Sequence, residues 1–464
     1  MKLLKKIAVA RILLIALALS ALASEPVNKS LSITEALDLA SAGADAVRAQ
    51  TALVSAAKAS VDSSRANFLP KISTTVSGAW LANPPEGMTL KAGDLGAMPP
   101  ALGGAKIPAN DITFIDDTKS TYFKGNITLS QPLFAWGKIG SAAAIASLEA
   151  QIAIAGQAGA ILDAKRQVET AYFTVAFCRE VKPLLASLRK MAASNVSDKN
   201  LALDAGLATK EQLLSAKSDL ADIDARIVEI DQTEKTSLYA LGILTGLDTA
   251  SLDLVSAFRT ELPAIDERSL EDRSAQVGEN SVTARRRLEE AGKKLDIAKG
   301  SMMLLPDLQL FSSFDFTGQT VPFSGKDWMD KTWTWDLTVG VAAKTNLFDG
   351  GASYANIREA KAGRDAATAA LTAQESAARM AARNAINAAR RAEAAIVQKM
   401  AHSEWYAESL KAATASFDNQ LASRADLNLA SMRETLGRVD LLQAQYNLEQ
   451  AIADLELVNG GSFQ

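Results

Sequence analysis

The chain has 464 residues, carries a net charge of −4 at pH 7, and is 48% hydrophobic but only 6% aromatic. A mildly acidic chain argues against binding to nucleic acid. One histidine and one cysteine exclude a His/Cys metal site and an intramolecular disulfide. Much of the apolar content is alanine, which favours helices and lets them approach closely, so the composition predicts closely packed helices.

Residues 1–23 have the pattern of a secretory signal peptide. Four Lys and Arg residues come first, an apolar run over residues 12–22 follows, and Ala21-Leu22-Ala23 forms an A-x-A cleavage site. We expect the mature chain to begin at Ser24 and, because no cysteine stands there, to carry no lipid anchor. A retained membrane helix is the alternative, but the apolar run is far shorter than the ~20 residues that a span needs.

The sequence beyond the signal contains one pattern twice, at a constant offset. Leu133-Phe134 recurs as Leu347-Phe348, and Gly246 recurs as Gly460, in one register without a gap. We therefore divide the mature chain into a first repeat, residues 24–260, and a second repeat, residues 261–464. Each repeat is predicted to contain a helix, two strands separated by a loop, a long helix, a tight turn and a return helix.

The opening helix of each repeat is predicted to end just before a proline. The first covers residues 34–67 before Pro70, and the second covers residues 270–303 before Pro306. These prolines are farther apart in the sequence than the repeat offset requires, so the first repeat contains an insertion. The insertion falls in the loop over residues 83–118, which is rich in Gly and Pro and is predicted to be exposed and irregular.

Four segments alternate apolar and polar residues: 72–80, 123–131, 308–316 and 333–341. Each has about nine residues, the length of a tilted membrane strand. No uninterrupted apolar run long enough for a helical span follows the signal, so we expect any membrane to be crossed by strands. A soluble, half-buried sheet would alternate in the same way, but aromatic residues at the segment ends favour a membrane interface. These aromatics are Trp80, Tyr122, Phe123, Trp136, Trp333 and Trp335.

Helical segments of unusual length follow each strand pair, over residues 137–203 and 351–417. Pro183 lies inside the first and predicts a kink, and Asp349 is the expected N-cap of the second. Turns near residues 204–209 and 418–423 reverse the chain into return helices with heptad spacing. The heptads begin at Leu213 in the first repeat, and Glu434 and Gly437 interrupt them in the second.

Four strands cannot close a barrel, and an open sheet edge cannot face lipid. The chain is therefore expected to oligomerise and share one barrel among its copies. Two copies would give eight strands, whose interior is filled by side chains. Three copies would give twelve strands, which could enclose a wet lumen lined by the Asn, Thr, Ser and Asp of the polar strand face.

Six short motifs occur in a fixed order along the mature sequence, and their order and duplication are more specific than any one motif. They are LSITEAL at 31–37, FLP at 68–70, QPLF at 131–134, TAYF at 170–173, AGLAT at 205–209 and NLFDGG at 346–351. With these motifs, nearly all of the mature chain resembles the TolC-type outer-membrane efflux protein family.

This resemblance implies a mainly α, internally duplicated fold that forms a homotrimer. A twelve-stranded antiparallel barrel in the outer membrane would be continued by an α-helical coiled-coil tunnel through the periplasm. The implied function is a passive exit duct of a tripartite efflux pump or a type I secretion system. Its partners would be outer-membrane lipid, a periplasmic adaptor and an inner-membrane pump of the RND, ABC or MFS type. The resemblance implies no catalytic activity, cofactor or metal, and it leaves drug efflux and protein secretion equally open.

The resemblance also assigns roles to the two hairpin tips. Similar family members close the tunnel with two aspartate rings at the second tip; Asp426 occupies the first aspartate position and Leu429 the second. A tyrosine and an arginine of the closing network fall on Phe417 and Ala422, and Arg424 lies close by, so the gate candidates are Asp426, Phe417 and Arg424. Asp426 could equally be a solvated helix residue. The adaptor-docking candidates are Gly206, Leu207, Ala208, Thr209, Leu421, Ala422 and Ser423.

Two other classes of protein remain as alternatives. A periplasmic coiled-coil scaffold without a pore would explain the helices but not the aromatic-flanked strands. An enzyme is poorly supported, because His402 and Cys178 are each alone in the sequence and no Gly-rich phosphate loop is present. A group of arginines is predicted to form a solvated face or interhelix ion pairs rather than an anion site: Arg379, Arg383, Arg390 and Arg391.

Overall fold

The computed structural model describes residues 29–115, 117–248, 252–254, 258–302, 305–319 and 333–461. The signal peptide expected over residues 1–23 and the expected helix end at Met303 lie outside these ranges. The chain forms two compact units. The sheet unit comprises residues 58–147 and 289–365, and the helical unit comprises the remainder.

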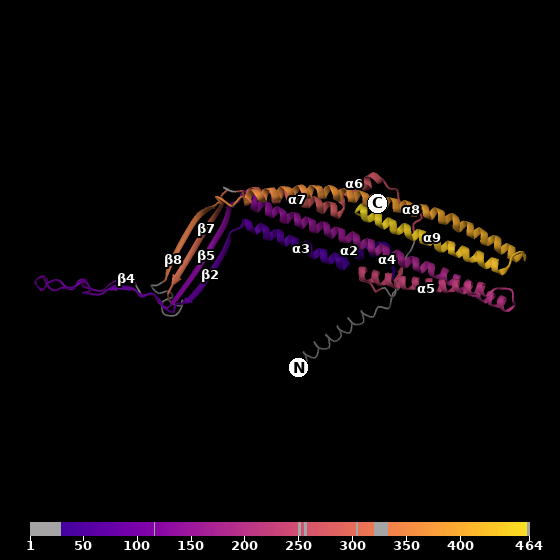
Figure 1. Cartoon of the computed structure of the whole chain (residues 1–464), viewed down its shortest axis with the longest axis horizontal. Helices are drawn as coiled ribbons and strands as arrows, with labels where there is room; N and C mark the ends of the chain where they lie inside the picture. Colours follow the sequence, from indigo (N-terminus) through magenta and orange to yellow (C-terminus); the bar gives the residue numbers. More distant parts are fainter. Residues whose placement is uncertain are drawn as a thin grey trace, which may run out of the picture. The chain divides into compact units, whose positions relative to one another are not determined.

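The sheet unit is built on four antiparallel strands. They are β2 (Lys71–Trp80), β5 (Thr121–Phe134), β7 (Asp307–Gly318) and β8 (Thr334–Lys344), in the spatial order β2-β5-β7-β8 (Figure 1). They coincide with the four alternating segments of the sequence. The mainly helical fold with antiparallel strands is thereby confirmed.

Strand register gives this sheet one apolar and one polar face, because directly opposite residues share a face. Ile72 pairs with Leu129, and Ile127 pairs with both Thr74 and Phe314. The polar face carries a side-chain network in which Asn126 Nδ2 donates to Ser313 Oγ at 2.9 Å and to Asp315 Oδ1 at 2.7 Å. Apolar side chains therefore line the opposite surface: Ile72, Val76, Trp80, Phe123, Ile127, Leu129, Phe314, Phe316, Trp335, Leu337 and Val339.

The loop over residues 83–118 is more ordered than expected. It contains an antiparallel pair, β3 (Met88–Leu90) and β4 (Ile112–Ile115), and a short 3₁₀ helix, η2 (Pro100–Leu102). Two aspartates hold the flanking backbone, since Asp117 accepts from Gly87 N at 2.7 Å and Asp111 accepts from Ala92 N at 2.7 Å. The expectation of an irregular loop is therefore wrong for these segments, because its Gly and Pro residues hid a short alternating pattern.

Each opening helix is broken where a single helix was expected. The first repeat has α2 (Ile33–Gly43) and α3 (Asp45–Arg65), followed by η1 (Ala66–Phe68), and the second has α6 (Glu267–Val277) and α7 (Glu279–Gly300). The breaks fall at Ala44 and Gly278, whose backbones are extended with ψ of 133° and 135°. Alanine is a strong helix former, so the signal for the first break is Gly43, the poor helix former directly before it.

Long helical hairpins complete each repeat, and their bounds keep the offset found in the sequence. Helices α4 (Lys138–Asp204) and α8 (Ala352–Asp418) have 67 residues each, and α5 (Lys210–Thr245) and α9 (Arg424–Asn459) have 36 each. Helix α4 continues through Pro183. Asp349 accepts hydrogen bonds from the backbone N–H of Gly351 and Ser353 at the start of α8, as expected of a capping residue.

Within the described ranges, helix α4 is also apolar enough to cross a membrane by length and composition. The expectation that only strands of the mature chain could do so was too strict. It relied on uninterrupted apolar runs, whereas the many alanine and isoleucine residues of α4 raise the mean hydropathy of one stretch despite the polar residues within it. In the structure this helix packs against α5 through Val181, Leu185 and Leu188.

Heptad residues of the return helices form the interhelix cores. Ile223, Ile227 and Ile230 of α5 pack against buried residues of α4. In the second repeat, Leu448 and Ile452 of α9 pack against Ile396 of α8. Glu434 and Gly437, which interrupt the second heptad series, are both buried.

Three of the four arginines singled out in the sequence, all on α8, form interhelix ion pairs with α6. Arg383 Nη1 lies 2.7 Å from Glu267 Oε2, Arg379 pairs with Asp272 at 3.6 Å, and Arg390 also pairs with Glu267. The structure therefore selects interhelix partners from the two alternatives left open by the sequence. A short parallel pair, β1 (Lys29–Leu31) and β6 (Leu252–Leu254), completes the helical unit.

Candidate functional site

The apolar face of the sheet remains uncovered within the protomer. Ile72 and Val76 are each 71% exposed, and Trp80 and Trp335 are each 72% exposed. Contiguous apolar surface of this kind marks contact with a membrane or a partner rather than with water. On the polar face, in contrast, Asn126 forms side-chain hydrogen bonds with Thr128, Ser313 and Asp315.

Five of the six predicted interface aromatics lie at the end of the sheet where β2 ends and β8 begins. Trp80 pairs with Thr121 and Tyr122 with Ala79, while Phe316 pairs with Trp335. The rings of Phe123 and Trp333 stack with centroids 6.5 Å apart. The sheet register therefore gathers these aromatics into one belt, as an interfacial girdle requires.

Trp136 is the aromatic at the opposite end of the sheet, just after β5. Its φ of 51° is unusual for a bulky residue, whereas its repeat counterpart Gly350 has a φ of 68°. Two contacts of the side chain stabilise this backbone conformation. Nε1 donates to the backbone oxygen of Pro306 at 3.0 Å, and the ring packs edge-on against Phe134 with the ring centroids 4.9 Å apart. Backbone strain retained by specific contacts is typical of a position with a defined role.

The two hairpin tips have the same backbone construction. Gly206 has a φ of 70°, and its counterpart Gln420 has a φ of 63°. Leu207 N donates to Ala202 O at 2.7 Å, and Leu421 N makes the equivalent bond to Ser416 O at 2.8 Å. Both leucines project outward and are 83% exposed. Each tip therefore presents one apolar side chain at its apex.

Capping boxes start both return helices. In the first tip Thr209 Oγ1 accepts from Gln212 N at 3.2 Å, and Gln212 Oε1 accepts from Thr209 N at 3.1 Å. In the second, Ser423 and Asp426 exchange the same pair of bonds at 3.3 and 3.0 Å. The S/T-x-x-[Q/D] spacing that produces these boxes is readable in the sequence as a helix start.

The structure places the three gate candidates around the second tip. Asp426 is exposed, and its Oδ2 also accepts from Ser423 Oγ at 2.7 Å, which lowers the pKa of the carboxyl group, with the Ser423 backbone adding to the effect. Arg424 is exposed and forms no ion pair within the described part of the chain, and Phe417 is half-buried. Asp426 is therefore brought together with Ser423 rather than with Arg424.

The helical unit also contains a buried ionic cluster that sequence reasoning missed. Glu449 is 1% exposed, and its carboxylate accepts from Arg259 through the backbone N at 2.6 Å and Nε at 2.9 Å. Nearby Glu169 has a pKa raised to about 8 by burial, then by the charge of Glu456 and a hydrogen bond with it. These residues come from α4, α9 and the segment after β6, so no local sequence pattern could have joined them.

Solved structures that are similar to this chain include outer-membrane proteins of other bacteria. VceC from Vibrio cholerae is 17% identical, with a TM-score of 0.69 over 93% of this chain and 97% of its own. The CmeC outer membrane channel of Campylobacter jejuni is 18% identical, with a TM-score of 0.69 over 93% and 86%. The MtrE outer membrane channel of Neisseria gonorrhoeae is 17% identical, with a TM-score of 0.68 over 92% and 89%. At these identities the likeness establishes the fold, which is that of an outer-membrane channel.

Residues 36–247 match the model of the family described as outer membrane efflux protein. The resemblance to the TolC-type family is therefore confirmed, by a sequence model across most of the first repeat and by fold across nearly the whole chain. A comparison with curated proteins finds no match.

Proposed function

We propose that this protein is the outer-membrane exit duct of a tripartite efflux or secretion assembly, and that it conducts its substrate passively and catalyses no reaction. The observation that carries the proposal is the four-stranded sheet with an uncovered apolar face and an opposite polar face. Such a sheet fits a boundary between lipid and water, because lipid requires apolar side chains and a channel requires polar ones.

The protomer alone leaves this sheet incomplete. Strands β2 and β8 each have one neighbour in the sheet, so their outer edges carry unpaired backbone groups. Those groups cannot face hydrocarbon. A homotrimer would pair β2 of one copy with β8 of the next and would close a barrel of twelve strands around the Asn126 and Asp315 face. Each protomer would then contribute two repeats, residues 24–260 and 261–464, to a pseudo-sixfold ring.

The remaining assignments follow from this arrangement. Residues 1–23 would direct export and be removed without lipidation, and the long helical hairpins would extend into the periplasm. The tips would dock onto an adaptor, with Leu207 and Leu421 as exposed apolar anchors, and an inner-membrane pump would supply the energy. Asp426, Phe417 and Arg424 would form the periplasmic gate at the second tip.

Reconstitution of the purified mature protein into planar lipid bilayers tests the channel directly. The expected result is a heat-sensitive trimer with discrete single-channel conductance. A monomer that stays in the soluble periplasmic fraction and gives no conductance would contradict the proposal and favour a coiled-coil scaffold. Deleting the gene and measuring both drug susceptibility and the secreted proteome would identify which substrate class is conducted.

Two neighbouring residues of β2 allow a matched test of the two faces. Val76→Arg places a charge on the proposed lipid face, which costs about 2–4 kcal/mol near the bilayer midplane and should prevent stable assembly. Thr75→Arg places the same charge on the proposed lumen face, where it should permit assembly and alter ion selectivity. Equal tolerance of both variants would instead indicate that neither face contacts lipid.

A further inference from the structure

The two repeats differ sharply where the short opening helix meets the longer one. The α2–α3 junction at Ala44 corresponds to the α6–α7 junction at Gly278, and the two have the same backbone. Ala44 N donates to Ala40 O at 3.2 Å, and Gly278 N donates to Ser274 O at 3.2 Å. Because the backbones agree, the side chains alone decide what each junction contains.

In the first repeat this junction is sealed by apolar packing. Ala44 and Val47 are buried against Ala164 of α4, and Ala160 and Ile161 of the same helix pack around them. The polar residue that opens α3, Asp45, points away from this cluster and pairs with Arg48 at 3.5 Å, with its side chain 86% exposed. Apolar side chains therefore fill the contact between the first junction and α4.

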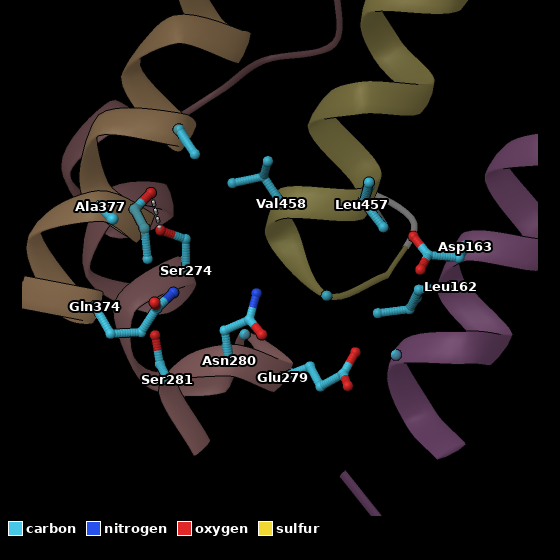
Figure 2. Close-up of a pocket in the computed structure, with 15 residues that line it drawn as sticks. Leu162, Asp163, Ser274, Glu279, Asn280, Ser281, Gln374, Ala377, Leu457 and Val458 are labelled. Atoms are coloured by element: carbon cyan, nitrogen blue, oxygen red, sulfur yellow. Dashed lines mark hydrogen bonds between the residues drawn. The ribbon is translucent and has the colours of Figure 1, made fainter. Parts of the chain in front are cut away.

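In the second repeat the corresponding region contains a cavity of about 390 Å³, drawn in Figure 2. It lies within the helical unit, among α4, the α6–α7 junction, α8 and the end of α9. Its walls combine polar and apolar side chains: Leu162, Asp163, Glu279, Asn280, Ser281, Gln374, Leu457 and Val458.

Two substitutions between the repeats replace apolar side chains at this site by polar ones. Ser281 stands where the first repeat has Val47, and Gln374 stands where it has Ala160. Ser281 is 1% exposed, yet its Oγ has no hydrogen-bond partner. Figure 2 shows this hydroxyl extending from α7 on the side of Gln374. A buried hydroxyl without a partner is unfavourable, so a ligand that reaches Ser281 in the cavity lining would gain a hydrogen bond.

Two carboxylates stand at the mouth of the cavity. Figure 2 shows Glu279 on α7 and Asp163 on α4 projecting into the space between these helices. Burial, and then the charge of Asp163, raises the pKa of Glu279. Gly159 makes room for this carboxylate, since a Cβ there would lie 1.6 Å from Glu279 Oε2. Among the described residues no Lys or Arg lines the cavity, so its negative charge is not compensated locally.

We propose that this cavity binds an organic cation, an ammonium group on a short aliphatic stem. The ammonium group supplies the positive charge that would compensate Asp163 and Glu279. Its three N–H donors can satisfy several acceptors, including the Ser281 hydroxyl. The stem packs against Leu162, Leu457 and Val458. A metal ion fits less well, because no group of three or more His, Cys, Asp or Glu side chains suited to a metal occurs in the described ranges.

This chemistry sets the direction of the pH dependence. Asp163 of α4 and Glu279 of α7 are the charged groups that line the cavity, while α8 and α9 contribute uncharged side chains. Gln50 of α3, which lies beside Glu279, is also uncharged. A bound cation favours the ionised form of Glu279, so binding should weaken as the pH falls and Glu279 becomes protonated.

Calorimetric titration of the purified full chain tests the proposal at low ionic strength. Two probes carry the same ammonium group, 1,5-diaminopentane as a free small cation and Nα-acetyl-lysine methylamide as a protein side chain, and glutarate is the anionic control. At least one amine should bind and glutarate should not, and the tighter amine identifies the source of the cation. Glu279→Gln and Asp163→Asn should each weaken binding about fivefold, as expected for a partly solvated charge pair.

Two variants separate binding from folding. Asp45→Asn changes the counterpart of Glu279 at the sealed junction and should leave the affinity unchanged. The double variant Ser281→Val with Gln374→Ala restores the side chains of the first repeat, so it should fold normally by circular dichroism and lose binding. Failure of both amines to bind, binding of glutarate, or undiminished binding by Glu279→Gln would overturn the proposal. None of these outcomes depends on channel conductance.

Discussion

The two repeats share a backbone but fill their helix interfaces differently. In the second hairpin Gly437 of α9 meets Tyr406 of α8, and a Cβ on this glycine would lie 2.7 Å from the tyrosine ring. The same two positions in the first hairpin hold Ile223 and Ala192. The large side chain is thus on the return helix in one repeat and on the long helix in the other. Duplicated helix pairs can therefore keep the same backbone while the large side chain at the interface moves from the return helix to the long helix.

Transplanting the first-repeat residue into the second repeat gives the largest expected effect. Gly437→Ile should lower the free energy of unfolding by about 2–3 kcal/mol, because the new side chain overlaps Tyr406 in a packed interface. Adding Tyr406→Ala, which completes the first-repeat pair, should recover most of that loss. Chemical denaturation of both variants measures the coupling; purely additive effects would show that the two positions are independent.

The next largest effect concerns the pH dependence of stability. Only the first repeat has a buried acid at this position, because Glu169 corresponds to Arg383 in the second repeat. The pKa of Glu169 is about 8, well above its ordinary value of 4.5, owing to burial and to Glu456. Between these pH values the unfolded chain releases this proton while the folded chain keeps it. The contribution of Glu169 to stability should therefore be fully present below pH 4.5 and should fall as the pH rises toward 8, by at least about 1 kcal/mol.

The control for this prediction is Glu169→Gln, which keeps the shape of the side chain but cannot ionise. Thermal melting at pH 5 and pH 8 should show a smaller difference for this variant than for the wild type. Arg259 and Glu449, which also face Glu169, remain in place in both proteins. An unchanged difference would assign the pH dependence to other groups.

The tips offer a smaller test of the same comparison. Gln420 has a left-handed backbone where the first repeat has Gly206, and this conformation costs a residue with a side chain about 1 kcal/mol. Gln420→Gly should therefore raise the melting temperature slightly, whereas Gly206→Gln should lower it. If both variants melt like the wild type, the tips do not take part in the cooperative unfolding transition.

The smallest expected change in stability comes from Asp426→Gln, which copies Gln212 of the first tip. The capping box should persist, so the free energy of unfolding should change by less than about 0.5 kcal/mol. If Asp426 also belongs to the proposed gate, the variant should lose cation preference in bilayer recordings. Unaltered selectivity would leave Asp426 as a helix cap and no more.

Much of this architecture could be predicted from the sequence, because its signals are local and periodic. Alternation of apolar and polar residues predicted all four strands of the main sheet, and the heptads identified the faces of α5 and α9 that pack against the long helices. The helix break at Ala44 was missed, because the single Gly43 before it is a weak signal that helices often tolerate. Among the site residues, aromatic positions at strand ends were readable. For Asp426 the sequence shows a capping motif with Ser423. That motif and a role in the gate are two competing interpretations of the same residue.

The sequence by itself determined the four strands of the main sheet, the two long helical hairpins and their duplication, because each depends on periodicity, propensity or a cap within a few residues. Only the tertiary structure decided how distant residues meet. It brought Glu169, Glu449 and Arg259 into one buried cluster, and it left a cavity at Ser281 where the first repeat has packed Val47. Burial and charge compensation depend on neighbouring residues from other helices. Residues at equivalent positions of two similar repeats can therefore acquire different roles.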